Sequence, residues 1–172
     1  MNKILIILLF CLFNRALLAN PGVPDNSAVI TQETDIILDG TIENVFHLFT
    51  PYGESLWAPE WKIVELSPQN KVVSKGFVFK PEGSESVWLV SSYDIDKYII
   101  QYSIYDLSKA EFRVIDIKLT PLKEITQASV RYTITATNND GMKKLKVDWS
   151  EVKYRHKILN WQSMINHFLS HN

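Results

Sequence analysis

Cysteine is almost absent from this chain of 172 residues, because the only one is Cys11. It follows Phe10 rather than a small residue, which argues against a lipid-modified cysteine. If the first residues are removed as a leader, no cysteine remains, so the mature protein has neither a disulfide nor a cysteine nucleophile. Such a domain is held together by its hydrophobic core alone, which a chain of about 150 residues is long enough to form. Hydrophobic residues make up 46% of the sequence, which suits one globular domain.

The N-terminal residues have the three parts of a secretory signal peptide. Lys3 provides a positive charge, residues 4–13 form an apolar run, and residues 16–19 end in Ala19, after which we expect cleavage. The apolar run is short for a membrane span; an uncleaved anchor is the alternative. We predict an exported protein, periplasmic or secreted, with a signal peptide at 1–19, a linker at 20–27 and a single domain at 28–172.

Runs of one charge and the common catalytic motifs are also missing. Lys and Arg number 18 and Asp and Glu 19, so we expect neither nucleic-acid binding nor an electrostatic hold on a membrane. The chain has no Gly-x-Ser-x-Gly, no Gly-x-Gly-x-x-Gly and no P-loop, so none of these motifs supports an enzyme. His167 and His171 are four residues apart, but no acid accompanies them. We therefore predict no metal site and no cofactor.

Alternating apolar residues predict strands along most of the chain. After a first strand at 28–38, Thr41 caps a helix that runs to Phe49, and Pro51 and Gly53 end it. Further strands are expected at 61–67, 76–80, 86–92, 98–105, 111–120 and 126–137, most of them separated by turn-forming clusters. Residues 138–141 then close the sheet and lead into the last helix.

The longest helical pattern covers residues 148–169, where apolar side chains recur at three- and four-residue steps. Asp148 and Glu151 fit a capping box at its start. The predicted apolar stripe comprises Trp149, Val152, Ile158, Leu159, Trp161, Ile165, Phe168 and Leu169. Because this helix and the antiparallel sheet each have one apolar face, they must bury each other, which predicts an α+β fold.

Strand alternation also predicts which side chains face the helix. The inner set is Phe77 and Phe79; Trp88 and Val90; Ile100, Tyr102 and Ile104; Ile115, Ile117 and Leu119; and Val130, Tyr132, Ile134 and Ala136. The outer set is Asp116, Lys118, Arg131, Thr133 and Thr135.

One stretch carries a family resemblance. Residues 48–61 contain Phe49, Thr50-Pro51, Glu54 and Trp57-Ala58-Pro59-Glu60-Trp61. This stretch resembles the START/Bet v 1-like superfamily, or SRPBCC, and its polyketide cyclase/dehydrase and lipid transport-like members. Further matches are Gly76–Phe79, Trp88, Ser129–Ala136 and a last helix that carries Trp161. The resemblance covers nearly all of the chain after the leader.

The resemblance implies a helix-grip fold, in which a curved seven-stranded antiparallel sheet surrounds a long C-terminal helix and two short helices follow the first strand. It also implies an apolar cavity between sheet and helix. Relatives bind lipids, sterols, polyketides and other hydrophobic molecules, and some catalyse cyclisation or dehydration. A signal peptide departs from most such proteins, which are cytosolic.

Inward-facing aromatic residues are the main candidates for a site, because small-molecule cavities are mostly apolar with a few placed polar groups. The predicted ligand-binding residues are Phe77, Phe79, Trp88, Tyr102, Tyr132 and Trp161. The alternative is that they only fill the core. Trp57, Pro59 and Trp61 are predicted to fix the corner between helix and strand, where the proline stiffens the chain.

No acid–base pair stands out, and Glu54 and His156 are weak catalytic candidates. Burial beside aromatic rings would raise the pKa of Glu54 and make it a proton donor. More often such an acid binds backbone donors in its own turn. His156 lies near the apolar stripe, within reach of the cavity, but a hydrogen-bonded structural histidine is commoner.

Three hypotheses follow. The first is a carrier of a hydrophobic small molecule or lipid, and the second is an enzyme of the cyclase or dehydratase type in the same cavity. The enzyme requires two titratable side chains that converge inside the cavity, whereas the carrier does not. The third is a fold kept for a protein contact, with a pocket well below the usual ~300 Å³.

Overall fold

The computed structural model describes residues 28–67 and 72–171. The predicted signal peptide and linker lie outside the described residues, as does part of the turn predicted after residue 67. No helix in the described ranges is both long and apolar enough to cross a membrane.

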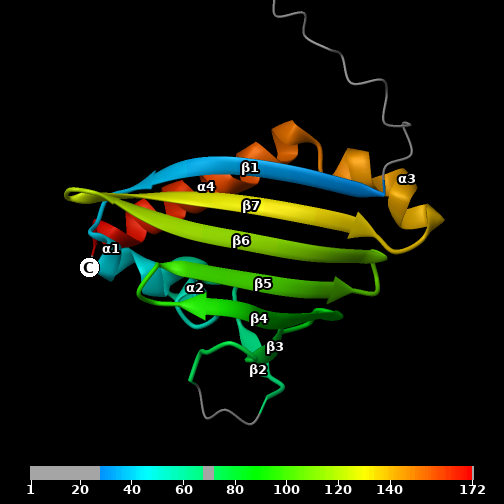
Figure 1. Ribbon diagram of the computed structural model, residues 1–172, viewed down its shortest axis with the longest axis horizontal. Coiled ribbons are helices and arrows are strands. Elements are labelled where there is room, and N and C mark those ends of the chain that lie inside the picture. Colours follow the sequence, from blue (N-terminus) through cyan, green and yellow to red (C-terminus); the bar gives the residue numbers. More distant parts are fainter. Residues whose placement is uncertain (1–27, 68–71, 172) are drawn as a thin grey trace, which may run out of the picture.

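The chain forms one seven-stranded antiparallel sheet with helices on one side of it (Figure 1). The elements are β1 (Val29–Leu38), α1 (Ile42–Val45), the 3₁₀ helix η1 (Phe46–Phe49), α2 (Glu54–Trp57), β2 (Ile63–Glu65), β3 (Val78–Pro81), β4 (Ser86–Asp94), β5 (Ile99–Asp106), β6 (Glu111–Leu122), β7 (Ile125–Ala136), α3 (Asn139–Asp148) and α4 (Glu151–Leu169). The strand order is β1-β7-β6-β5-β4-β3-β2. The predicted α+β class, the seven strands, the two short helices after β1 and the long last helix are confirmed.

The strands follow the alternation of the sequence. In β6, Ile115, Ile117 and Leu119 are buried, whereas Lys118 is exposed. The predicted inner set is buried throughout, except that Trp88 and Ala136 are partly buried. A period of two keeps all these side chains on the face that α4 covers.

Helix α4 crosses behind the sheet and packs against the edge strand β1, to which its side chains are hydrogen-bonded (Figure 1). The amide of Ile37 donates to Gln162 Oε1 at 2.9 Å, and the amide of Asp39 donates to Asn166 Oδ1 at 3.1 Å. Asn166 Nδ2 donates in return to the Ile37 carbonyl at 3.2 Å. The helix therefore satisfies backbone groups at the end of a strand that has only one neighbour.

The start of the last helix differs from the prediction. Residues 139–148 form a separate helix, α3, which includes most of the connection predicted at 138–141, and α4 begins after the N-cap Ser150. A capping box of Asp148 and Glu151 is therefore wrong, because Asp148 ends α3. The side chain of Asn138 caps α3 by accepting from the amides of residues 140 and 141.

The break at residues 149–150 also changes which face of α4 is buried. Val152 is 79% exposed and Leu159 40% exposed, although both were placed in the apolar stripe. The buried positions of α4 are instead Tyr154, Ile158 and Ile165, with Trp161 partly buried. These positions follow steps of four, three and four residues from Tyr154, so the stripe is set by α4 alone rather than by a helix from residue 148.

The predicted helix from residue 41 to Phe49 is split into α1 and η1, and the side chain of Thr41 makes no cap hydrogen bond to its backbone. Gly53 then allows α2 to approach η1 closely, because a Cβ at this position would lie 1.9 Å from the carbonyl oxygen of His47. This contact places Glu54 at the first turn of α2, inside the protein.

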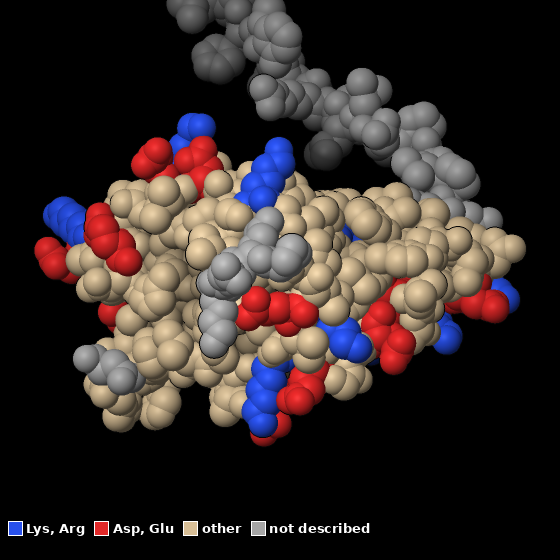
Figure 2. All heavy atoms as spheres, turned by 90° about the horizontal axis from the view of Figure 1, so that it is seen from below, with Lys and Arg blue, Asp and Glu red and all other residues tan. Residues whose placement is uncertain are grey.

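On the face seen in Figure 2, lysine and arginine side chains alternate with aspartate and glutamate, and the described part of that face has no wide basic patch.

Candidate functional site

A cavity of about 200 Å³ opens where the start of α4 meets the β5–β6 hairpin. Its walls come from Lys109, Glu111, Asp148, Trp149, Lys153, Tyr154 and Lys157. Gly141 of α3 packs against this hairpin, since a Cβ there would lie 2.7 Å from the carbonyl oxygen of Ala110. Glycine at this position therefore allows close backbone contact between α3 and the hairpin.

Three charged residues enter the interior next to this cavity. Asp106 continues the inner face of β5 after Ile104, and Glu111 and Arg113 begin the inner face of β6. Arg113 Nη2 donates to Asp106 Oδ2 at 3.0 Å, and Arg113 Nε lies 3.8 Å from Glu111 Oε2. Glu111 is 1% exposed and Arg113 7% exposed, so the three charges depend on one another for compensation.

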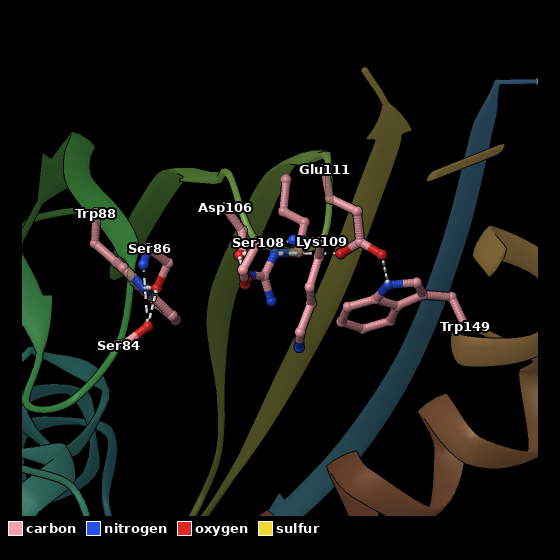
Figure 3. A network of polar contacts seen from close by, with 9 residues as sticks. Ser84, Ser86, Trp88, Asp106, Ser108, Lys109, Glu111 and Trp149 are labelled. Carbon is pink, nitrogen blue, oxygen red and sulfur yellow. Dashed lines mark hydrogen bonds and ion pairs between the residues drawn. The ribbon is translucent and has the colours of Figure 1, made fainter. Parts of the chain in front are cut away.

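Trp149, in the short link between α3 and α4, completes this network. Its indole Nε1 donates to Glu111 Oε1 at 3.0 Å, and Figure 3 shows the carboxylate turned toward the indole. The guanidinium carbon of Arg113 lies 5.8 Å from the Trp149 ring centroid, within cation–π range. The ring of Trp149 thus separates the buried ion pairs from α4.

Lys157 is a half-buried residue of α4 whose amine lies against the rings of the interior. Its Nζ lies 4.7 Å from the ring centroid of Tyr132, 5.2 Å from that of Trp149 and 5.7 Å from that of Trp161. Burial of the amine, with a further contribution from the nearby Arg113 cation, lowers the pKa of Lys157 to about 8. Glu54 acts in the opposite direction but does not cancel these effects.

Glu54, in the first turn of α2, is buried and only 6% exposed. Desolvation raises the pKa of its carboxyl to about 8, against a smaller lowering by Lys157. Among the described residues, no side chain donates a hydrogen bond to this carboxyl. Burial, and then the charge of Glu54, raise the pKa of both Tyr102 and Tyr132 well above the ordinary value.

Solved structures share this architecture. The crystal structure of Ara h 8.0201 matches with a TM-score of 0.59 and 16% identity, over 83% of this chain and 99% of that chain. Norcoclaurine synthase from Thalictrum flavum, in complex with dopamine and hydroxybenzaldehyde, matches with a TM-score of 0.62 and 8% identity, over 91% and 96%. The Zhui aromatase/cyclase from Streptomyces sp. R1128 matches with a TM-score of 0.57 and 13% identity, over 81% and 93%.

These neighbours are Bet v 1-like proteins of the SRPBCC superfamily. The chain has the Bet v 1-like helix-grip fold. The resemblance seen in the sequence is therefore confirmed at the level of the fold, which is what identities this low can show. No protein-family model matches the sequence, and neither does any curated protein.

Within the helix-grip fold, the six predicted ligand-binding aromatics lie on the inner side. Phe79 connects one group of rings, with centroids 5.8 Å from Phe77, 5.6 Å from Trp88 and 6.1 Å from Tyr102. Tyr132 belongs to the second group, and its centroid lies 6.3 Å from that of Trp161. The hydroxyl of Tyr102 donates to the carbonyl of residue 49 at 2.7 Å, so its polar atom is engaged in the fold.

The two tryptophans of the resembling motif bind the backbone of the preceding segment. Trp57 Nε1 donates to the Leu48 carbonyl at 2.8 Å, and Trp61 Nε1 donates to the Pro51 carbonyl at 2.9 Å. Pro59 lies exposed between them. The ring of Trp57 also lies 5.9 Å from that of Trp161, which links this corner to α4.

The histidines do not take part in the interior site. His156 is exposed on α4, so the prediction that it reaches the cavity is wrong; the inward position next to it belongs to Lys157. The rings of His167 and His171 lie 4.3 Å apart on the exposed end of α4. In the described ranges, no group of three or more His, Cys, Asp or Glu is placed to hold a metal.

Sequence reasoning missed Lys157 and the Asp106–Glu111–Arg113 network. The spacing of the residues contains a signal for both. Arg113 is two residues before Ile115 on a strand, and Lys157 is three residues after Tyr154 on a helix, so each shares a face with a buried residue. Selecting only apolar residues for the inner face removed these positions from consideration. Charged residues in phase with a buried face are the pattern that marks an interior polar site.

Proposed function

We propose that the protein is an exported carrier that binds a hydrophobic small molecule or lipid between the sheet and α4. The observation that carries this proposal is the cavity of about 200 Å³ with Trp149, Tyr154 and Lys157 in its walls. Five of the seven residues in its walls are charged, and Trp149 and Tyr154 supply the aromatic surface, so the cavity suits a ligand that has both a polar end and an apolar part. The neighbours with the same fold, among them a synthase that holds dopamine and hydroxybenzaldehyde, support the proposal.

The cavity volume also supports a choice among ligands. It lies below the ~300 Å³ at which drug-sized pockets begin, so we expect a compact ligand, such as a one- or two-ring aromatic compound, rather than a sterol. Glu111 and Lys157 would then contact its polar end, and the aromatic rings its apolar part.

Native mass spectrometry of the protein from its own host tests this proposal. We expect a compound bound at one-to-one stoichiometry, and a protein mass that corresponds to cleavage after Ala19. Titration with aromatic compounds, fatty acids and sterols should change tryptophan fluorescence. The change should be lost in Trp149→Phe and kept in Trp61→Phe, which removes an indole that binds the Pro51 carbonyl. An empty protein that binds none of these compounds would refute the carrier function.

An enzyme of the cyclase or dehydratase type is the second candidate. The observation that favours it is that two titratable groups, Glu54 and Lys157, act on each other's pKa in the interior. Perturbed pKa values that move toward each other near neutral pH are typical of acid–base sites.

A further inference from the structure

The side of the sheet turned away from α4 carries an exposed apolar row at the end where β5 leads into β6 (Figure 1). The strand register places its five members side by side, in the order Val87, Tyr105, Phe112, Thr135 and Val29. We call them the outer row. Its two valines, the tyrosine and the phenylalanine are each 39–44% exposed. Single exposed apolar residues are ordinary, whereas a contiguous row marks a surface that binds something.

The next row on this face is also uncharged. Its members, on the same five strands, are Leu89, Ser103, Val114, Thr133 and Thr31. Charges begin at the third row, where Asp116, Arg131 and Glu33 lie side by side. Neither of the first two rows therefore holds an acid or a base. A partner that recognises charge, such as an acidic peptide or an anionic membrane, finds no complement there.

The outer row is nearly symmetric about its middle. Phe112 lies at its centre, a valine lies at each end, and a residue with a hydroxyl, Tyr105 or Thr135, lies between. A two-fold axis through Phe112, parallel to the strands, would place this ring against its own copy and Val87 opposite Val29. The hydroxyls of Tyr105 and Thr135, which make no side-chain hydrogen bond among the described residues, would face each other. Such self-complementarity is what an isologous dimer requires.

We propose that this face is covered by a second copy of the chain, in a two-fold dimer whose outer rows pack against each other. Sheets that pack face to face lie about 10 Å apart and bury the side chains between them. The second row extends the contact, since Val114 would lie against its own copy and Ser103 opposite Thr133. Asp116 in the third row would meet its own copy, so the contact ends there.

The size of this surface predicts a weak dimer. At ~4.8 Å between strands and ~3.4 Å per residue, two rows across five strands cover a footprint of about 300 Å². Stable complexes bury ~800 Å² per partner. Leu107, 67% exposed in the turn after β5, adds to the apolar surface. We therefore expect monomer and dimer to exchange, with a dissociation constant on the order of 10–100 μM.

The dimer leaves the cavity open, because the outer row faces away from α4, which supplies Lys153, Tyr154 and Lys157 to the cavity walls. Dimerisation is therefore independent of the proposed binding function, and either can hold without the other.

Sedimentation velocity across a range of concentrations tests the proposal. The mean mass of the wild type should rise from monomer toward dimer between about 1 μM and 1 mM. Phe112→Lys places two like charges on the axis and should raise the dissociation constant by at least about 10²-fold. Leu122→Lys is the matched control, because it lies on the same face of β6 at the other end of the strand and is 41% exposed against 39% for Phe112. It should dimerise as the wild type does.

A cysteine on the axis tests the geometry itself. In a Cys11→Ser background, Phe112→Cys should form an intermolecular disulfide under mild oxidation, because each thiol faces its own copy. Leu122→Cys should not. Non-reducing electrophoresis separates the two results, and this variant decides the question if Phe112→Lys does not fold.

Three outcomes would overturn the proposal. The first is a wild type that stays monomeric at about 1 mM, where a dissociation constant of ~1 mM already leaves half of the protein paired. The second is a dimer that both Phe112 variants leave unchanged and uncrosslinked, because another surface then holds it. The third is a monomer whose outer row binds phosphatidylcholine vesicles, which would assign this face to a membrane.

Discussion

The two ends of the interior are built from the same strands but differ in chemistry. At the end with α1 and the C-terminus of α4, the buried polar side chains near these helices are the uncharged Thr50 and Thr126, and Phe46 stacks on Tyr93 at 5.7 Å. At the opposite end, with α3 and the β5–β6 hairpin, buried Asp106, Glu111 and Arg113 replace apolar residues. We call these the apolar end and the charged end.

The difference shows what an interior charge does in a helix-grip fold. Apolar residues close the apolar end by packing against one another, whereas ion pairs and directed hydrogen bonds hold the charged end around a cavity. Buried charges contribute little net stability, which is consistent with the proposed binding of a ligand at the charged end. The predictions below test this difference.

The largest effect is expected from breaking the charged end. Arg113→Ala leaves Asp106 and Glu111 buried without their cation, and should lower the free energy of unfolding by about 3–5 kcal/mol. Arg131→Ala is the control, because its 2.9 Å ion pair with Glu33 lies on the exposed outer face and should contribute only about 0–1 kcal/mol. Urea denaturation measures both, and equal losses would show that the charged end is not a buried network.

A smaller effect depends on pH. The folded pKa of Glu54 is raised from 4.5 to about 8, so the folded state binds its proton more tightly than the unfolded state. Wild-type stability should therefore be highest below pH 4.5 with respect to this group and be lost as pH rises toward 8. Glu54→Gln should match the wild type at pH 5 and exceed its stability at pH 8 by about 2–4 kcal/mol.

Chemical denaturation at the two pH values checks this, with the exposed Glu124→Gln as control. The pH dependence that Lys157 contributes has the opposite sign. Its lowered pKa makes the free energy of unfolding rise with pH between about 8 and 10.5. A stability difference between Glu54→Gln and the wild type that does not change from pH 5 to 8 would contradict burial of this carboxyl.

The smallest effect compares two tryptophans, one in each group of rings. Trp149→Phe removes a hydrogen bond to the Glu111 carboxylate and should cost about 1.5–3 kcal/mol, the range for charged partners. Trp88→Phe removes a hydrogen bond to the Ser86 hydroxyl at 2.9 Å and should cost about 0.5–1.5 kcal/mol. Thermal unfolding of the two variants measures the difference, and a larger loss for Trp88→Phe would reverse the comparison.

Most of the sheet was predictable from sequence. A period of two is a local property of a strand, so the inner positions of β5, β6 and β7 followed directly from residues such as Tyr102, Ile117 and Val130. The long last helix and the corner at Trp57 and Trp61 were predictable for the same reason, since each depends on spacing within a short segment.

The start of α4 was not predictable in this way. Apolar residues recur at helical steps from residue 148 onward, yet α3 ends there and the chain turns at Trp149. That turn is stabilised by contacts with Glu111 and Tyr132, which lie far away in sequence. The phase of the helix, and with it the exposure of Val152 and His156, therefore depends on distant strands.

The sequence by itself determined the fold class, the strand positions and the aromatic inner face, because hydrophobic periodicity acts over a few residues. The tertiary structure alone decided that Glu54 is buried, that Lys157 is half-buried near enough to affect its pKa, and that Trp149 meets Glu111. Those relations join residues from distant elements, and burial changes the pKa values of Glu54 and Lys157 only once these elements have packed together.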